Sequence, residues 1–171
     1  VDGVSVLGPT SGAQACGEVG EGRMLEPAEI LDALTAFLQP KLLADKRVLL
    51  TVGPTFEALD PVRGLTNSSS GKMGFALARA CAEVGAGVTA ICGPIALPTP
   101  SGVTRINVQS ALQMREAVLA ALPADIFIAV AAVADFRPAA AMEHKIKKGA
   151  TTLTLELVAN PLPVKPVSGL W

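Results

Sequence analysis

Short apolar runs alternate with segments of helical period along most of this chain. The runs predict strands at 47–52, 87–92, 103–108 and 125–131, and the periodic segments between them predict helices at 72–83 and 111–122. The last run is continuous, as expected of a strand covered on both faces. Strands that alternate with helices predict an α/β fold with a parallel, doubly wound sheet. Right-handed crossovers then place the strand ends at one edge, where a ligand is expected.

The first 40 residues follow a different pattern. Residues 1–25 are rich in glycine and lack a hydrophobic period, which predicts a surface loop; the alternative is an active-site flap that carries the thiol of Cys16. A helix is expected to begin at Glu26-Pro27, because proline is tolerated in the first turn, and to end by Pro40. We therefore expect a separate N-terminal piece at 1–40, a linker at 41–46 and the main domain at 47–160.

The pattern breaks down again after the fourth predicted strand. Residues 136–150 are basic, and they suit either a solvated loop or a lid that brings lysine over a polyphosphate. Residues Thr152–Val158 alternate between apolar and polar, which predicts a strand. The prolines that follow Asn160 cannot complete a sheet, so 161–171 is expected to be an atypical tail.

Composition excludes several classes of function. The 171 residues carry a net charge of −1 and include five Phe, one Trp and no Tyr, so neither broad nucleic-acid binding nor a base-stacking surface is expected. No apolar run is long enough for a membrane span and no signal peptide is visible. The three cysteines, Cys16, Cys81 and Cys92, and the single His144 suit neither a disulfide framework nor a Cys/His metal site. We expect a cytoplasmic protein in which Cys81 and Cys92 are core residues.

The stretch from Thr51 to Gly74 has the pattern of a phosphate site. A strand stops at glycine, a polar loop follows, and a helix begins at Lys72, so backbone N–H groups and the positive end of the helix dipole can face a phosphate. The loop is neither a Walker A motif nor GxGxxG, since Lys72 precedes Met73. The candidate substrate-binding residues are Gly53, Ser69, Ser70, Gly71 and Lys72.

Three further features lie beside expected strand ends. Asn67 can polarise a carbonyl or hold a tetrahedral intermediate, with a turn residue as the alternative. The small residues Ala129, Val130 and Ala131 allow a flat ligand to approach the backbone, and Asp135 can accept from a ribose hydroxyl, hold Mg²⁺ or cap a helix. The basic run that begins at Lys145 supplies charge for phosphates. These features indicate a nucleotide together with a second phosphorylated ligand, and no Ser-His-Asp set is present.

Several of these motifs resemble one known family. GPTFEALDPVR (53–63), TNSSSGKMG (66–74), CGPIALPTP (92–100), AAVADFRP (131–138) and KIKK (145–148) resemble, in order and spacing, the ligase half of the bacterial bifunctional phosphopantothenoylcysteine decarboxylase/phosphopantothenate–cysteine ligase. This resemblance covers about residues 45–160. Upstream, SGAQACGEVGEGRM (11–24) resembles the flap that ends the decarboxylase half. The chain is therefore expected to straddle the junction of the two halves.

The resemblance implies a Rossmann-like ligase that acts as a homodimer in coenzyme A biosynthesis. CTP would activate the carboxylate of 4′-phosphopantothenate as an acyl cytidylate, Mg²⁺ would neutralise the triphosphate, and the amine of L-cysteine would displace CMP. Asn67 matches the residue that stabilises the cytidylate, and Lys145 matches a lid lysine of the activation step that also binds the nucleotide. The other implied nucleotide contacts are Ala129, Val130, Ala131, Asp135, Pro161, Leu162, Pro163 and Val164. The motifs favour CTP over ATP.

The chain also departs from the family pattern. The flavin-binding body and the catalytic histidine of the decarboxylase are absent, so FMN is expected only with that half, and Cys16 matches a flap cysteine that here has no site to serve. At 161–164 the chain has Pro-Leu-Pro-Val where the family has Pro-Asp-Ile and an apolar residue. We expect a C-terminal truncation or a frameshift near Pro161. The alternatives to a ligase are a decarboxylase completed by the missing half and an inactive nucleotide-binding remnant.

Overall fold

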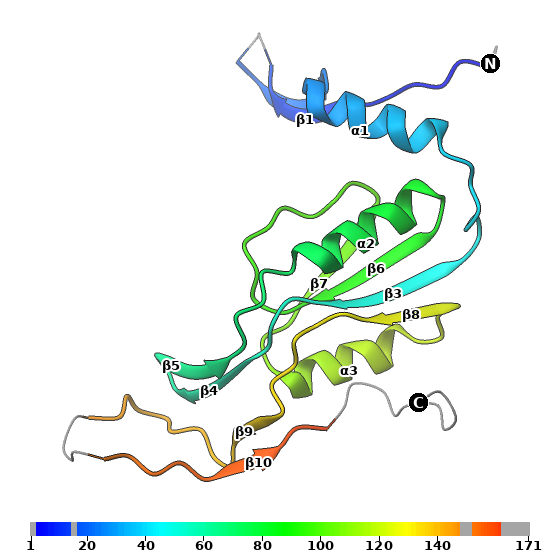
Figure 1. Ribbon diagram of the computed structural model, residues 1–171. Helices are drawn as coiled ribbons and strands as arrows, with labels where there is room; N and C mark the ends of the chain where they lie inside the picture. The colour runs from blue at the N-terminus through cyan, green and yellow to red at the C-terminus, as the bar shows by residue number, and fades with distance from the viewer. Residues whose placement is uncertain (1–2, 15–16, 148–151, 162–171) are drawn as a thin grey trace.

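The computed structural model describes residues 3–14, 17–147 and 152–161, and its centre is a four-stranded parallel sheet (Figure 1). Every pair of neighbouring strands in this sheet is parallel, as expected for an α/β fold. The prediction of a parallel α/β sheet is confirmed. The strand order is β7 (Val103–Asn107), β6 (Gly87–Cys92), β3 (Arg47–Val52) and β8 (Ile126–Ala129).

Helices cover both faces of the sheet, so the fold is doubly wound (Figure 1). Helix α2 (Lys72–Glu83) lies on one face and α3 (Ala111–Ala121) on the other, close to the predicted bounds. Successive side chains of a strand point to opposite faces, and β3 accordingly contributes to two cores. Its side chains at 48, 50 and 52 pack with those of α2, whereas Leu49 packs with Met114 and Val118 of α3. Burial of both faces explains the apolar run at 48–52. The strand predicted at 125–131 is shorter, Ile126–Ala129, and is only half-buried at the end of the strand order.

Helix α3 begins with two side-chain contacts. The hydroxyl of Ser110 accepts a hydrogen bond from the backbone N–H of Gln113 at 3.3 Å, which confirms the predicted N-cap. The buried carboxylate of Glu57 accepts from the N–H of Ala111 at 2.9 Å. A negative charge at this end also favours the helix dipole. Glu57 therefore ties the segment after β3 to the helix behind the sheet.

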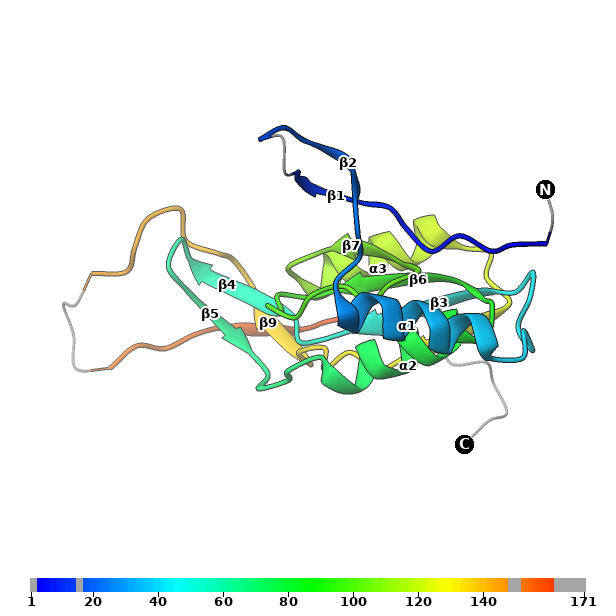
Figure 2. The ribbon, with the colours of Figure 1, turned by 90° about the horizontal axis from the view of Figure 1, so that it is seen from above.

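The N-terminal piece contains a β-hairpin followed by a helix, so the surface loop predicted at 1–25 is wrong for the two paired strands. Strands β1 (Thr10–Ala13) and β2 (Val19–Arg23) pair antiparallel, and α1 occupies Pro27–Leu38, as its period predicts. The hairpin projects away from the body in Figure 2. Most of its side chains are exposed, and backbone pairing holds it together, which explains why it leaves no hydrophobic period.

Helix α1 lies against α2 on the outside of the molecule (Figures 1 and 2). The guanidinium of Arg79 on α2 lies 2.6 Å from the carboxylate of Asp32 on α1 and 2.7 Å from Glu83. The ammonium of Lys41 donates to the carbonyl of Glu83 at 2.9 Å. These contacts join the N-terminal piece to the helix that begins at the candidate phosphate loop.

Two further antiparallel pairs form a projection that we call the arm, residues 56–66, 136–147 and 152–159 (Figure 1). The region 53–71, expected to be a loop, contains the paired strands β4 (Phe56–Asp60) and β5 (Arg63–Thr66). Strand β9 (Phe136–Pro138) pairs with β10 (Leu157–Ala159). The strand predicted at Thr152–Val158 is wrong in extent, because the short β9 offers a partner only to the last residues.

The cysteines that the structure describes are largely packed away. Cys92 is fully buried in the core beneath α2, as predicted, and Cys81 is partly buried against the same core. Burial raises the pKa of both thiols, because it disfavours the thiolate. Within the described ranges, no helix is long and apolar enough to cross a membrane.

Replacing Gly93 with alanine is expected to destabilise the fold strongly. A Cβ at this position would lie 1.6 Å from the carbonyl oxygen of Pro54, so the two strand-end loops would have to separate. We expect the free energy of unfolding, measured by denaturant titration, to fall by about 3 kcal/mol. Gly87→Ala, at the other end of β6, is the matched control, because its Cβ would lie 3.9 Å from the nearest atom. Equal effects of the two substitutions would contradict this close approach.

Candidate functional site

The ends of two neighbouring central strands are joined by backbone hydrogen bonds. After β8, the N–H of Val130 donates to the carbonyl of Thr51 at 3.2 Å, and the N–H of Ala132 donates to the carbonyl of Gly53 at 2.9 Å. The N–H of Thr55 donates to the carbonyl of Ala132 at 3.3 Å. Parallel pairing thus continues past the regular strands, as the bridge between Pro54 and Ala132 shows. The structure brings the glycine end of the loop against the small-residue run at 129–131.

Buried threonines fill the gaps in this irregular pairing. The hydroxyl of Thr51 accepts from the N–H of Ala131 at 3.3 Å, and that of Thr55 accepts from the N–H of Ala134 at 3.0 Å. Both threonine side chains are buried. Sequence reasoning missed them, although a threonine inside an apolar strand and another directly after Gly-Pro were available signals. They fix the backbone on which the nucleotide is expected to bind.

Asn67 connects the candidate phosphate loop to the same strand end. Its side-chain amide nitrogen donates to the carbonyls of Ala132 at 3.0 Å and Val133 at 3.3 Å. Its own carbonyl accepts from the N–H of Ser69 at 2.9 Å, so the residue also begins a tight turn. The two roles considered from the sequence, turn and functional amide, are therefore compatible. The exposed Asn67 stands between the two expected ligand positions.

Helix α2 begins with glycine because the chain needs an unusual conformation and little bulk there. Gly71 is the N-cap residue, with φ 74° in the left-handed region that favours glycine. A Cβ on Gly74 would lie 2.6 Å from Val52, so this glycine lets the first turn sit directly on β3. The first helical bond runs from the N–H of Phe75 to the carbonyl of Gly71 at 3.1 Å. The N–H of Lys72 makes a long contact with the hydroxyl of Ser70 at 3.4 Å, and the N–H groups of residues 73 and 74 lie ahead of the first helical bond, so this positive end of the helix can receive an anion.

Asp135 follows the small-residue run and is exposed. Its carbonyl accepts from the N–H of Asn160 at 2.8 Å, and the amide of Asn160 donates to the carbonyl of Ala134 at 2.8 Å. Strand β9 begins at the next residue, so the helix-cap alternative for Asp135 is wrong. Sequence reasoning missed the positioning role of Asn160. Pro161 lies beside it, whereas Leu162, Pro163 and Val164 lie outside the described residues.

Lys145 lies in the arm. The N–H of its neighbour Ile146 donates to the carboxylate of Asp60 at 3.0 Å, and the guanidinium of Arg63 donates to the carbonyl of Ile146 at 3.0 Å. The basic segment is therefore pinned to the tip of the β4–β5 hairpin. No hydrogen bond or ion pair within the described ranges joins Lys145 to Asn67, so the structure does not bring these two candidate catalytic residues together. Cys16, the third, lies outside those ranges.

Asp60 is the electrostatic anchor of the arm. Its buried carboxylate accepts from the N–H groups of Ile146, Val62 and Arg63, and the guanidinium of Arg63 lies 3.8 Å away. These contacts, first the bond from Ile146, hold the pKa of Asp60 below its ordinary value. The charged carboxylate is thus the form that the folded arm stabilises.

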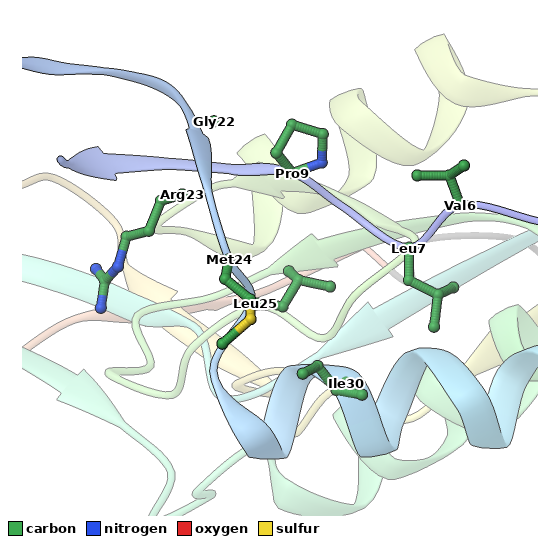
Figure 3. Close-up of a pocket in the computed structure, with 8 residues that line it drawn as sticks. All are labelled: Val6, Leu7, Pro9, Gly22, Arg23, Met24, Leu25 and Ile30. Carbon is green, nitrogen blue, oxygen red and sulfur yellow. The ribbon is translucent and has the colours of Figure 1, made fainter. Parts of the chain in front are cut away.

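A cavity of about 400 Å³ lies away from this constellation, in the N-terminal piece (Figure 3). Its lining is apolar except for Arg23. Apolar walls suit neither a nucleotide nor a phosphate, so we do not place the candidate site there. The cavity lies between the hairpin and α1 and is lined by Val6, Leu7, Pro9, Gly22, Arg23, Met24, Leu25 and Ile30.

The sheet, its covering helices and the strand-end loops define an α/β protein of Rossmann-like type. Residues 43–168 match the family model described as the DNA/pantothenate metabolism flavoprotein C-terminal domain, and the chain belongs to this family. The matched range extends beyond Pro161, so most of the expected atypical tail lies within the family model. The resemblance of the ligase-side domain is thereby confirmed.

Named relatives agree with this assignment. The chain is 57% identical over 171 residues to the coenzyme A biosynthesis bifunctional protein CoaBC of Vibrio cholerae, covering 98% of this chain and 43% of that protein. A crystal structure of the C-terminal domain of CoaBC is 44% identical, with a TM-score of 0.59 over 68% of this chain and 55% of that one. A Cab2 mutant in complex with phosphopantothenate-cysteine is 18% identical, with a TM-score of 0.56 over 78% of this chain and 65% of that one. The chain thus spans less than half the length of its curated relative.

Acidification is expected to release the basic segment from the hairpin tip. Because the folded arm lowers the pKa of Asp60, its anchoring is complete above about pH 4, the ordinary range of Asp, and is lost as the pH falls through the lowered value. NMR titration of the Ile146 amide should therefore show a midpoint below the ordinary pKa of an aspartate. Asp60→Asn should abolish this transition, since an amide cannot accept at both positions. Asp125→Asn, directly before β8, is the control, and the transition of the Ile146 amide should persist in this variant. Its loss in Asp125→Asn would contradict the assignment to Asp60.

Proposed function

We propose that this chain carries the site for CTP-dependent ligation of 4′-phosphopantothenate to L-cysteine in coenzyme A biosynthesis. Membership of the pantothenate family and the names of the relatives support the pathway. The observation that carries the proposal is the bridge from Asn67 to the carbonyls of Ala132 and Val133. It places an amide between a helix N-terminus suited to a phosphate and a strand end suited to a nucleotide.

In the proposed reaction, each half of the site holds one substrate. The phosphate of 4′-phosphopantothenate binds at Gly53, Ser69, Ser70, Gly71 and Lys72, where backbone N–H groups and the helix dipole favour an anion. CTP binds along Ala129, Val130 and Ala131, with Asp135 at the ribose and the segment from Pro161 completing its contacts. Half-buried backbone at 130–133 lets the flat base approach closely.

Two bond exchanges complete the ligation. A carboxylate oxygen of phosphopantothenate attacks the α-phosphorus of CTP, and the bond to pyrophosphate breaks. The amine of cysteine then attacks the acyl carbon, loses a proton, and CMP leaves. Asn67 donates to the oxygen that becomes negative during this second attack, exchanging one of its present carbonyl partners for the substrate.

Lys145 is assigned to the activation step, where its ammonium offsets charge on the triphosphate. The segment that bears it is held at the hairpin tip by Asp60 and Arg63, so this role requires the arm to approach a nucleotide site. A homodimer, which the family resemblance implies, belongs to the same proposal.

Mg²⁺ belongs to the proposal because it neutralises a triphosphate. In the part of the chain that the structure describes, no three His, Cys, Asp or Glu side chains gather to hold a metal ion. These described residues therefore do not form a metal site made of protein ligands alone. Mg²⁺ commonly binds through substrate phosphates and one or two carboxylates, and no residue of this chain is assigned to it.

Pyrophosphate release tests the proposal directly. Purified protein is incubated with 4′-phosphopantothenate and either CTP or ATP, before and after addition of cysteine. We expect release that depends on phosphopantothenate, is faster with CTP, and is followed by phosphopantothenoylcysteine when cysteine is present. Binding of CTP without any release would identify an inactive nucleotide-binding remnant and reject the ligase.

Asn67→Asp separates the two steps. A carboxylate cannot donate to the developing oxyanion, so cysteine coupling should slow by about 100-fold while the first turnover of pyrophosphate release persists. The measurement is single-turnover release compared with product formation. Gln109→Glu, an exposed amide-to-acid change at the end of β7, is the control and should leave both steps intact. Unchanged coupling in Asn67→Asp would show that the residue has no role in transfer.

A further inference from the structure

Arg105 on β7 makes an unusual number of contacts with backbone that crosses the strand ends. Its two terminal nitrogens donate to the carbonyls of Leu97 at 2.8 Å and Ile95 at 3.0 Å, and its Nε donates to Asn107 at 2.7 Å. Its guanidinium carbon lies 5.4 Å from the ring centroid of Phe75 in the first turn of α2. One half-buried side chain thus holds the 94–97 loop and contacts the helix that begins at the candidate phosphate loop.

The loop that Arg105 holds carries Ile95 over both glycines of the candidate phosphate site. A Cβ on Gly53 would lie 2.7 Å from Ile95, and a Cβ on Gly71 would lie 2.8 Å from it. Both glycines have a positive φ, 79° and 74° respectively, a conformation that glycine adopts without the usual strain. Ile95 therefore fills the space between them and limits their alternative conformations.

We propose that Arg105 is a positioning residue for the phosphate site. By holding Ile95 against Gly53 and Gly71, it keeps the N–H groups at the start of α2 directed at a phosphomonoester. Its planar guanidinium donates to two carbonyls at once, a geometry that the single ammonium of lysine cannot reproduce. The identity of the ligand rests on the proposed function, whereas the control of the glycine loop rests on the contacts above.

Hydrogen exchange tests the control of the loop without any ligand. In the full chain, Arg105→Ala should speed exchange of the hydrogen-bonded amides of Gly93 and Phe75 by about tenfold, because local opening of the 94–97 loop and of the start of α2 becomes easier. Exchange in Arg105→Lys should be intermediate between that in the wild type and that in Arg105→Ala. Arg115→Ala, an exposed arginine on α3 across the sheet, is the matched control and should match the wild type. Faster exchange confined to Gly93, or wild-type exchange in Arg105→Lys, would overturn the proposal.

Steady-state kinetics with 4′-phosphopantothenate, CTP and cysteine provide the second measurement. Loss of preorganised phosphate binding should raise the KM for phosphopantothenate by about tenfold in Arg105→Ala, with kcat within about twofold of the wild type. A merely structural role would lower the melting temperature and the active fraction, and so reduce kcat at unchanged KM; that result overturns the proposal. If the wild type itself releases no pyrophosphate, the ligase proposal fails, and hydrogen exchange alone decides the role of Arg105.

Discussion

The hydrogen bonds between the ends of β3 and β8 are the contact on which the candidate site depends. A regular parallel sheet would diverge where its strands end and would leave backbone groups without partners. Here the backbone beyond Val52 and the backbone beyond Ala129 remain paired, and Thr51 and Thr55 supply hydroxyl acceptors where backbone carbonyls do not reach. Buried polar groups need such partners, and the same seam presents the carbonyls of Ala132 and Val133 to Asn67.

Packing demands at the same edge explain the small residues there. Gly74 lets α2 sit on β3, and Gly93 lets one strand-end loop cross another at the backbone of Pro54. Ile95 then covers the remaining space above the glycine loop. The loop is thus confined from several sides by apolar contacts, while Ser70 and Lys72 stay exposed. Confinement of this kind reduces the entropy that binding would otherwise remove.

The central fold follows from sequence pattern because burial is nearly complete there. Strands 47–52 and 87–92 lie between two helical layers, so most of their interior positions are apolar and the runs are easily recognised. The strands of the hairpins at 10–23 and 56–66 cannot be predicted in this way. Their side chains are exposed or only partly buried in no regular order, and backbone hydrogen bonds pair the strands. A strand predicted from alternation at 152–158 shrinks to three residues for lack of a partner.

The candidate site, too, can be predicted only in part from the sequence. Topology alone places the loop around Gly71 near the strand end at 129–131, because both follow central parallel strands. The residues that hold these pieces together, such as Thr55, Arg105 and Asn160, act on distant carbonyls and carry no local signature. The position of Lys145 on a projecting arm is equally a matter of tertiary contacts, since charge in the sequence says nothing about distance.

Glu57 determines where the arm can move. Its carboxylate, at the root of the arm, is engaged by the N-terminus of α3 on the far side of the sheet. Rotation of the whole arm about its root would pull a buried charge away from that helix, at a high energetic cost. The hairpin tip, by contrast, is held by a carboxylate that protonation can neutralise. The contact at the root of the arm therefore persists when acid weakens the contact that holds the basic segment at the hairpin tip.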